Sequence, residues 1–362
     1  MDVLGAVFLT QDADMVVEEL ELDEPGQGEV LVRYGASGLC HSDLSIINGT
    51  LPLPGPSILG HEGAGVVEAV GPGVTSVVPG DTVIVSFIQA CGRCFHCVRG
   101  EGQLCEAGLL GQPRFTRRDG AKIVGALGGC ASFAQCTVIP EGSVVKVETS
   151  VPVEQLALIG CGVTTGTGAV LNTAEVEPGS SVAVVGCGGV GTAAVQGARI
   201  AGASTIIAVD VAESKLDTAR KLGATDGVLA GAGHDPVGAV RELTGGRGVD
   251  YAFEVIGNAA TLRQAYDMVR RRGTVVAVGV PALDAQLALP IADLIMGEKA
   301  VLGSLYGSAQ IARDFPRLVR FIETGQLDVG AMVSRTISLD EVNDGFDAMR
   351  KGEVIRSVIS YA

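Results

Sequence analysis

The chain has no tryptophan, and aromatic residues make up only 4% of its 362 positions. Basic residues are also scarce: 26 Lys and Arg stand against 41 Asp and Glu, which gives a formal net charge of -15. No run of Lys or Arg is long enough to follow a phosphate backbone, which argues against nucleic acid as a partner. The composition therefore directs attention to small-molecule ligands.

Long hydrophobic runs are missing as well. The uncharged stretch "VAVVGCGGVGTAAVQGA" at 182–198 falls short of the roughly 20 strongly apolar residues that a membrane helix needs, and its glycines predict a turn. The first twenty residues carry acidic side chains where a secretory signal has a basic head and an apolar stretch. We therefore expect a cytoplasmic protein with no membrane partner.

Nine cysteines are present, an odd number that cannot all pair as disulfides. Four of them follow the spacing C-x2-C-x2-C-x7-C in "CGRCFHCVRGEGQLC": Cys91, Cys94, Cys97 and Cys105. Four thiolates so spaced can surround one zinc ion tetrahedrally and leave it no open position, which predicts a structural site. An iron-sulfur cluster is the alternative for the same ligands. We expect His96, inside this stretch, at the surface.

A chain of 362 residues exceeds the usual size of one hydrophobic core, so we expect two domains. Up to about residue 160, short Val-rich runs separated by Gly and Pro are typical of short β-strands. From about residue 180, strand-like and helix-length segments alternate, which predicts a parallel, doubly wound sheet. Helical patterns return after about residue 305 and end in a strand-like "IRSVIS".

A glycine-rich loop lies between the strand-like "SVAVV" and the next helical pattern. It fits G-x-G-x-x-G, a dinucleotide-binding turn, with Gly186, Gly188, Gly189, Val190 and Gly191 as the candidate cofactor-binding residues. Asp210 follows Gly191 by nineteen residues, at the end of "TIIAVD". A carboxylate there accepts hydrogen bonds from ribose hydroxyls and repels a 2′-phosphate, which favours NAD over NADP. Lys215 is either a further ribose contact or a solvated helix lysine.

Three further fragments contain metal-binding side chains: "GLCHSD" with Cys40, "LGHEGAG" with His61 and "LIGCGVTTG" with Cys161. One imidazole and two thiolates give zinc three protein ligands and an open fourth position, as a catalytic zinc requires. Taken singly, each cysteine can be a small apolar core residue, and His61 a hydrogen-bonded core histidine. The residues alone therefore show only that the three fragments can supply an open metal site, and the packing explanation is preferred for each fragment taken singly.

Together these motifs resemble the zinc-dependent medium-chain alcohol dehydrogenase family. The resemblance covers essentially the whole chain and rests on "GHEGAGVVEAVGPGV", the four-cysteine stretch and "VGCGGVG". It implies an α/β fold with a GroES-like β-rich catalytic domain at 1–162, whose structural zinc lobe spans 91–105. A Rossmann NAD-binding domain with a doubly wound parallel sheet is then inserted at 163–305, and 306–362 completes the catalytic domain.

The resemblance also implies roles for individual residues. Cys40, His61 and Cys161 become ligands of a catalytic zinc, so that the chain binds two zinc ions. Near that metal it implies Glu62 as an aid to ligand exchange, Asp43 as the acid that orients His61, and Ser42 as the group that receives the alcohol proton. His41 and Arg356 match positions that contact the coenzyme pyrophosphate, and Val280 is a further candidate cofactor-binding residue. Cys130, Cys136 and Cys187 match no ligand and are expected to be packing residues.

The implied reaction is hydride transfer between an alcohol and NAD, with zinc polarising the substrate oxygen and Ser42 passing a proton outward. Ser45 stands where well-known members have the histidine that ends this proton relay, so His41 and water remain open as the terminal acceptor. Leu51, Phe87, Leu109 and Val280 match positions at the substrate pocket or its mouth, although core packing explains each one as well. They favour an apolar primary alcohol or its aldehyde, aliphatic or benzylic.

Several alternatives stay open at this point. Some relatives oxidise formaldehyde as a thiol adduct; apolar Leu51 and Leu109 weaken the glutathione version but not another thiol carrier. Others keep NAD permanently bound and need an external acceptor. Polyol dehydrogenases are disfavoured because Cys161 stands where they have glutamate, and a catalytically silent protein would need no open zinc site. The apolar segment 282–307 predicts the edge of a homodimer, with a tetramer as the alternative.

Overall fold

The computed structural model describes residues 1–107, 109 and 111–361. Its residues group into two compact units. The first contains 1–162, 310–324 and 329–362, and the second contains 163–309 and 325–328. Each unit has hydrophobic clusters of its own, as expected for a domain that buries its own core.

The first unit is built from β-strands. Five of them form a closed barrel in the order β1-β2-β7-β8-β4, and a seven-stranded sheet runs β10-β6-β5-β3-β18-β17 with β9 also paired to β3. The strands are β1 Asp2–Phe8, β2 Val16–Leu22, β3 Glu29–Gly38, β4 Ser57–Ile58, β5 Glu62–Val70, β6 Thr82–Val85, β7 Phe115–Thr116, β8 Lys122–Gly125, β9 Cys136–Pro140, β10 Val144–Lys146, β17 Val333–Ile337 and β18 Arg356–Ser360.

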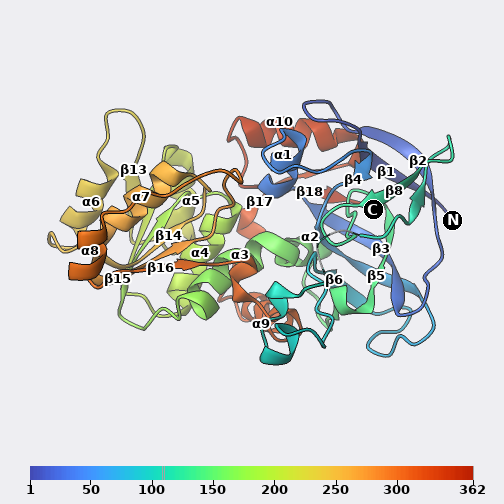
Figure 1. Cartoon of the computed structure of the whole chain (residues 1–362), viewed down its shortest axis with the longest axis horizontal. Helices are drawn as coiled ribbons and strands as arrows, with labels where there is room; N and C mark the ends of the chain where they lie inside the picture. The colour runs from blue at the N-terminus through green and yellow to red at the C-terminus, as the bar shows by residue number, and fades with distance from the viewer. Residues whose placement is uncertain (108, 110, 362) are drawn as a thin grey trace. The chain divides into compact units, whose positions relative to one another are not determined.

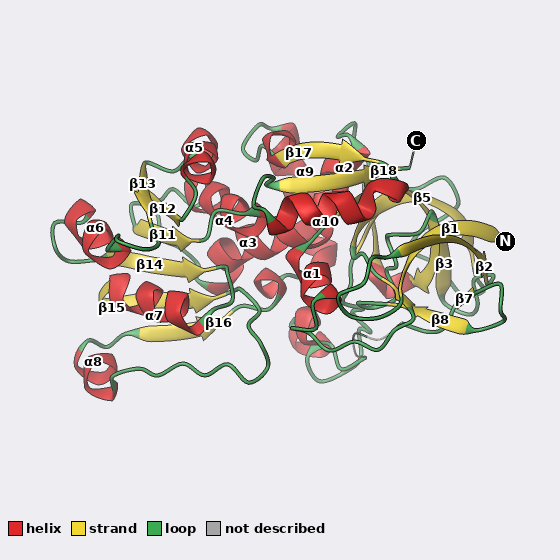
Figure 2. Cartoon of the chain, turned by 90° about the horizontal axis from the view of Figure 1, so that it is seen from above, coloured by secondary structure: helices red, strands yellow, loops and turns green. Residues whose placement is uncertain are grey.

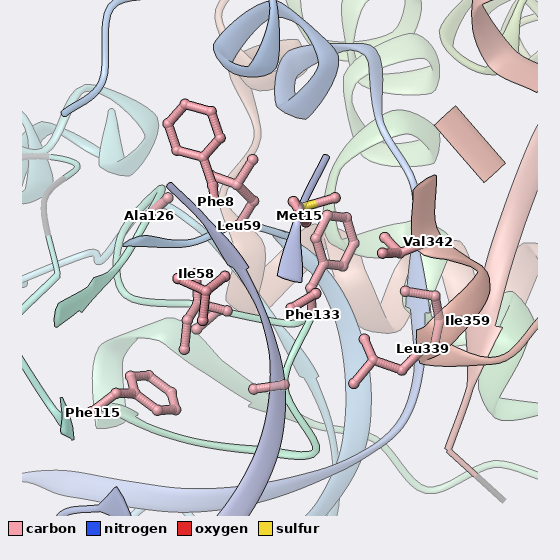
Figure 3. Packing of buried hydrophobic residues seen from close by; sticks show 14 of the residues in the cluster. Phe8, Met15, Ile58, Leu59, Phe115, Ala126, Phe133, Leu339, Val342 and Ile359 are labelled. Atoms are coloured by element: carbon pink, nitrogen blue, oxygen red, sulfur yellow. The ribbon is translucent and has the colours of Figure 1, made fainter. Parts of the chain in front are cut away.

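The main core of this unit lies between the barrel and the C-terminal segment. Phe8, Ile58, Leu59, Phe115 and Phe133 belong to one buried cluster, together with residues from positions 337 to 359 (Figure 3). Because Leu59 precedes His61 by two positions, the chain enters the candidate site from a fully packed segment. Close packing of the residues before His61 restricts the orientation of the His61 side chain.

Short helices complete the first unit. The α-helices are α1 His41–Ile47, α2 Val153–Leu158, α9 Ile311–Glu323 and α10 Val342–Arg350. The 3₁₀ turns are η1 Cys97–Arg99, η2 Gly102–Leu104, η3 Glu141–Ser143, η7 Gly330–Met332 and η8 Leu339–Glu341. Helix α10 follows a capping box in which Ser338 and Glu341 satisfy each other's backbone N–H groups. Apart from α9, which has 13 residues, these elements are short.

The second unit is a six-stranded parallel sheet. Its strand order is β13-β12-β11-β14-β15-β16, the order expected of a Rossmann fold (Figure 2). The strands are β11 Ser181–Val185, β12 Thr205–Asp210, β13 Asp226–Leu229, β14 Val249–Glu254, β15 Val269–Ala277 and β16 Ala300–Gly303. After Ser181, strand β11 is apolar and buried, because both faces of the sheet are covered.

Helices cover the two faces of this sheet (Figure 1). Buried residues of α4 and α5 share one hydrophobic cluster with alternate strand residues, and buried residues of α6 and α7 share the other. The helices are α3 Thr164–Gly168, α4 Gly189–Ile200, α5 Glu213–Leu222, α6 Pro236–Leu243, α7 Ala259–Met268 and α8 Ile291–Met296, with the 3₁₀ turn η6 Tyr306–Ser308. The predicted doubly wound parallel sheet is confirmed.

One continuous helical run spans Val153–Thr173. It includes α2, α3 and two π-helical segments, η4 Ile159–Val163 and η5 Ala169–Thr173. Among the described residues this run alone has the length and hydropathy of a membrane span, yet 78% of its most apolar window is buried inside the protein. It is therefore explained as a core helix. The stretch at 182–198, the segment singled out from the sequence, instead forms β11, the glycine loop and part of α4.

Candidate metal centre and coenzyme loop

His61 lies between β4 and β5 and is almost completely buried. Its Nδ1 lies 3.2 Å from Asp43 Oδ1, and the same carboxylate oxygen accepts a hydrogen bond of 2.9 Å from the Gly60 backbone N–H. Gly60 has a φ of +87°, and a Cβ there would lie 2.6 Å from the Phe133 ring. When Nδ1–H donates to Asp43, the lone pair of Nε2 is left available for a metal.

Cys40 and Cys161 approach the same point from two other segments. Cys40 is the residue before α1, and Cys161 lies in the π-helical segment η4. Their thiol sulfurs and a His61 ring nitrogen all lie within 4.8 Å of one another, and all three residues are buried. The tertiary structure thus brings together the three fragments that the sequence offered separately.

The electrostatics of this cluster suit a cation. The Cys161 thiol and His61 lower the pKa of Cys40 well below its usual range, although burial opposes this. Burial alone would lower the pKa of His61, but Asp43 and Cys40 raise it well above its ordinary value. Anionic groups that stabilise an added proton in this way also stabilise a metal ion, and two sulfurs with one nitrogen are ligands that zinc prefers.

Glu62 and Arg356 form a buried ion pair beside these ligands. Arg356 donates through Nη2 to Glu62 Oε1 and through Nη1 to the Leu39 carbonyl, at 3.2 Å. Glu62 Oε1 also accepts a 2.7 Å hydrogen bond from Gly162 N–H, one residue beyond Cys161. Among the described residues Glu62 Oε2 has no hydrogen-bond partner. Burial raises the pKa of Glu62 to about 7, against the opposing effect of Arg356.

Sequence reasoning missed this ion pair. It treated Glu62 as a neighbour of the metal and Arg356 as a coenzyme contact, whereas the two residues, 294 positions apart, bond directly. Neither residue carried a local signal for the pairing, because it depends on β18 adding to β3 in the sheet. Arg356 is 4% exposed, so its guanidinium is held within the first unit.

Phe87 provides an apolar surface next to His61. The two rings meet edge to face, with centroids 5.4 Å apart and an interplanar angle of 83°. Leu51 is partly buried against the main core, and Leu109 is 45% exposed with its carbonyl accepting a hydrogen bond from Gly128 N–H. The structure therefore places Phe87 against His61, whereas Leu51 packs against the main core and Leu109 is exposed.

The four-cysteine cluster is compact and partly exposed. The sulfurs of Cys91, Cys94, Cys97 and Cys105 lie within 4.8 Å of one another. Both the Cys91–Cys97 and the Cys94–Cys105 sulfur separations are 4.0 Å, far beyond a disulfide bond of about 2.05 Å. Zinc–sulfur bonds of about 2.3 Å in a tetrahedron place neighbouring sulfurs about 3.8 Å apart, so the spacing fits one zinc ion.

Backbone amides support these sulfurs. Cys91 N–H donates to Cys105 Sγ at 3.3 Å, and Cys97 N–H donates to Cys94 Sγ at 3.4 Å. Hydrogen bonds from the backbone N–H groups of Glu106 and Cys97 lower the pKa of Cys94 to about 6. His96 is partly exposed, and its Nδ1 lies 2.9 Å from Glu101 Oε2. The loop thus favours thiolates at Cys91 and Cys94, whereas burial raises the pKa of Cys97 to about 12, and His96 is directed to a surface carboxylate.

Three of the four glycines in the coenzyme loop meet different requirements. Gly186 has a φ of +97°, which a tight turn after β11 needs. A Cβ at Gly191 would lie 1.8 Å from the Gly186 carbonyl oxygen, so only glycine lets α4 pack this close. At Gly188 no described heavy atom lies within 4 Å of an added Cβ, which leaves room for a pyrophosphate at the start of α4.

Asp210 lies at the carboxyl end of β12, beside this loop. Its Oδ2 accepts a 2.7 Å hydrogen bond from Cys187 N–H, and its Oδ1 accepts one of 3.0 Å from Ala212 N–H. The carboxylate is therefore oriented by the glycine loop itself, and each oxygen keeps a second lone pair for a ribose hydroxyl. Lys215 is half-buried on α5, and Val280 is exposed after β15.

The remaining predicted residues are also placed. Ser42 is half-buried on α1, with its Oγ 3.8 Å from Cys40 Sγ, and His41 is exposed at the first position of α1. Cys130, Cys136 and Cys187 are fully buried, and burial raises the pKa of Cys187 to about 12. Their surroundings are those of packing residues.

Comparison with known proteins agrees with this geometry. Residues 26–149 match the family described as "Alcohol dehydrogenase GroES-like domain", and residues 189–324 match "Zinc-binding dehydrogenase". An S-(hydroxymethyl)glutathione dehydrogenase of Paracoccus denitrificans is 39% identical over 378 positions, and an NDMA-dependent alcohol dehydrogenase of Amycolatopsis methanolica is 40% identical over 374 positions. Each alignment covers all of both chains.

Solved structures give the same result. The benzyl alcohol dehydrogenase of Acinetobacter calcoaceticus has a TM-score of 0.92 with this chain at 35% identity, and the alignment covers 100% of both. The chain belongs to the zinc-dependent medium-chain alcohol dehydrogenase family. The predicted family, the predicted GroES-like and Rossmann fold and the predicted activity class, an alcohol dehydrogenase, are confirmed. Membership implies zinc and NAD as cofactors and a small alcohol or aldehyde as substrate.

Proposed function

We propose that this enzyme transfers a hydride between an apolar primary alcohol, aliphatic or benzylic, and NAD. The observation that carries the proposal is the buried set of Cys40, His61 and Cys161 with the Phe87 ring set edge-on against His61. Three protein ligands leave zinc an open position for a substrate oxygen, and an apolar ring against the histidine ligand favours an apolar carbon chain over a charged one.

Two zinc ions per chain are part of the proposal. Cys40, His61 and Cys161 hold the first, and the four cysteines of the 91–105 lobe hold the second. When bound, the first ion supplies Lewis acidity to the substrate oxygen while the coenzyme accepts the hydride. The second, closed by four thiolates, has no position left for a substrate and stabilises its loop.

The chain's own residues then divide the work of positioning and proton movement. Asp43 fixes the His61 ring by accepting from Nδ1–H and is itself held by Gly60 N–H. Ser42, close to Cys40, accepts the proton of the alcohol hydroxyl and passes it outward, to His41 or to water, because Ser45 cannot act as a base near neutral pH. Glu62, beside the ligands and paired with Arg356, assists ligand exchange.

The coenzyme is assigned to the second unit. Gly186, Gly188, Gly189, Val190 and Gly191 form the pyrophosphate turn, and Asp210 binds the ribose hydroxyls, which selects NAD over NADP. Lys215, Val280, His41 and Arg356 keep their predicted roles as further coenzyme contacts, Val280 also bordering the substrate. The Arg356 guanidinium also donates to Glu62 and to the Leu39 carbonyl, so a coenzyme contact has to compete with both.

Two further candidate functions are each supported by the name of one relative. The name of the Paracoccus relative favours a thiol adduct of formaldehyde as substrate, and the name of the Amycolatopsis relative favours an enzyme that needs an added electron acceptor. In the second case NAD would stay bound through the catalytic cycle. Apolar Leu51 and Leu109 argue against a glutathione adduct, since its carboxylates require charged partners.

The deciding experiment is a panel of primary alcohols from ethanol through octanol to benzyl alcohol, with NADH formation followed by absorbance and zinc measured on the same protein. Turnover that favours the longer or aromatic alcohols supports the proposal. If protein with two zinc ions per chain forms no NADH on any alcohol, the proposal fails. Turnover restored by an artificial acceptor would then identify bound NAD, and turnover restored by formaldehyde with a thiol would identify the adduct.

A homodimer completes the proposal. Strand β16 ends the strand order of the second unit, and nearby Ile291, Ile295 and Met296 are 71%, 67% and 77% exposed. An apolar face next to a sheet edge is the kind of surface that a second copy covers. Light scattering of the wild type and of Ile295→Glu would test this, with a change from two chains to one expected. Both cysteine sets need reduced thiols, which fits the predicted cytoplasmic location.

A further inference from the structure

The loop of residues 126–132, between β8 and β9, has an unusual backbone. Leu127, Gly128, Gly129 and Ala131 have φ values of +48°, +74°, +84° and +47°, so four of five consecutive residues are left-handed. Two of them carry side chains, which rarely adopt this conformation. Such a backbone persists only where the surroundings hold it in place, and such segments concentrate at functional sites.

The surroundings of this loop do hold it at both ends. Ala126 N–H donates to the Ile58 carbonyl at 2.8 Å, and Ser132 N–H donates to the Gly60 carbonyl at 3.0 Å. In the middle of the loop, Thr137 Oγ1 donates to the Gly129 carbonyl at 3.0 Å. Since Gly60 is the residue before His61, the loop is anchored on the segment that carries the metal-binding imidazole.

The same loop touches Phe87. A Cβ at Gly128 would lie 2.1 Å from the Phe87 carbonyl oxygen and 3.1 Å from its Cα, so the two backbones are in direct contact. Phe87 in turn meets His61 edge to face. One loop therefore sets the positions of both partners in this ring contact, His61 through Gly60 and Phe87 through Gly128.

We propose that the 126–132 loop is a positioning element that fixes the distance between Phe87 and His61 and so determines which alcohols the site accepts. Gly128 is its key residue, because only a glycine allows the loop to come this close to Phe87. The inference rests on the proposed function, in which Phe87 borders the substrate. It concerns the backbone behind that side chain and predicts that a change with no contact to substrate alters substrate preference.

Gly128→Ala and Gly129→Ala form a matched pair for the test. Both residues are neighbours with left-handed φ, so alanine brings a similar backbone strain to each. At Gly129 the nearest described atom to an added Cβ is Gly111 Cα at 3.3 Å, whereas at Gly128 the clash is with Phe87. The measurement is kcat and KM for ethanol and for benzyl alcohol with NAD, together with zinc content and the thermal midpoint.

For Gly128→Ala we expect the ratio of kcat/KM for benzyl alcohol to that for ethanol to fall by about 10- to 100-fold, because a displacement of about 1 Å has effects of this size. Both zinc ions should be retained. Gly129→Ala should change the ratio by less than about twofold. An equal loss on both alcohols in Gly128→Ala, or an equal ratio change in Gly129→Ala, overturns the proposal. Failure of the proposed function looks different, since the wild type itself would then oxidise neither alcohol.

If Gly128→Ala does not fold, Leu127→Gly is the variant that tests whether the loop controls the position of Phe87. It adds no atom and removes the left-handed strain at position 127, so the loop relaxes while the fold is kept. A loosened loop should reduce the benzyl-to-ethanol ratio by about two- to fivefold, and the thermal midpoint should fall because the Leu127 side chain packs against the main core. An unchanged ratio in a folded Leu127→Gly variant would show that the loop does not control Phe87.

Discussion

The two clusters of metal-binding side chains in this enzyme differ in how they are built. The cysteines of the 91–105 lobe come from one short stretch and are all partly exposed, whereas Cys40, His61 and Cys161 come from three distant segments and are all buried. In the lobe, a bound metal would hold the chain together, because none of the lobe residues belongs to the main hydrophobic cluster of the first unit. In the buried cluster, the fold holds the ligands in place for the metal. The first cluster should therefore govern stability and the second activity.

The largest expected effect is that of Cys161→Ala. Removal of one of three ligands should reduce zinc from two ions to one per chain and lower kcat/KM by about 10³-fold or more, because the open site loses its metal. Zinc analysis and the NADH assay on the same preparation test this. Cys136→Ala, which removes a fully buried cysteine outside both clusters, is the control and should keep both ions. Full activity in Cys161→Ala would contradict the claim that the buried cluster governs activity.

Cys94→Ser should act on stability instead. Loss of one lobe thiolate should release the other zinc ion and lower the thermal midpoint by roughly 5–10 °C, because metal binding and folding of the loop are coupled. The activity of the protein that remains folded should fall by less than about fivefold. Calorimetry and zinc analysis provide the measurement, with Val98→Ala, an exposed lobe residue, as control. A variant that lost activity without losing stability would make the lobe a catalytic element.

A smaller change is expected for Asp43→Asn. The amide can still accept one hydrogen bond but lacks the charge that orients His61 through Nδ1, so zinc affinity or kcat should fall by about 10- to 100-fold. Zinc bound by the lobe should be unaffected, so this one variant should show different effects at the two clusters. Asp81→Asn, which removes a partly buried carboxylate paired with Lys146 in the same unit, should leave zinc affinity and kcat near wild type. Loss of both ions in Asp43→Asn would contradict this assignment.

The smallest effect concerns the surface of the lobe. A hydrogen bond from His96 lowers the pKa of Glu101, so the stability contributed by its carboxylate is complete above the unfolded value of about 4.3 and is lost as the pH falls through the lower folded value. Glu101→Gln should lower the thermal midpoint at pH 7 by less than about 2 °C, and by less still at pH 3. Melts at the two pH values, with Glu148→Gln as control, test this. A larger fall in the thermal midpoint of Glu101→Gln at pH 3 than at pH 7 would contradict the lowered pKa of Glu101.

Local patterns explain why much of the fold and site could be predicted. The glycine loop, Asp210 and the lobe cysteines each combine residue type, spacing and neighbouring strand or helix within a few dozen positions. The helical run Val153–Thr173 had no such pattern: Gly160, Gly162 and Gly166 weaken its helix propensity, and burial of its apolar residues stabilises it instead. Strand β15 likewise begins at Val269, within an Arg-rich segment that suggested no strand.

Contacts between distant segments were beyond prediction from residue patterns. The pairing of Glu62 with Arg356 and the contact of Gly128 with Phe87 are made by residues that have no distinguishing sequence neighbours. Each depends on how strands stack and where loops return, which are consequences of packing the whole unit. Resemblance to the family supplied the ligand set of the open site, and the geometry then showed what surrounds it.

By itself the sequence determined the alternation of strands and helices, the coenzyme turn and the ligands of the lobe, because these depend on periodicity, glycine conformations and short ligand spacing. Only the tertiary structure decided that Cys40, His61 and Cys161 share one buried point, that Arg356 is bound to Glu62, and that the 126–132 loop supports Phe87. The physical reason is that a long-range contact forms only when a shared core fixes both partners, and no short stretch of sequence contains that core.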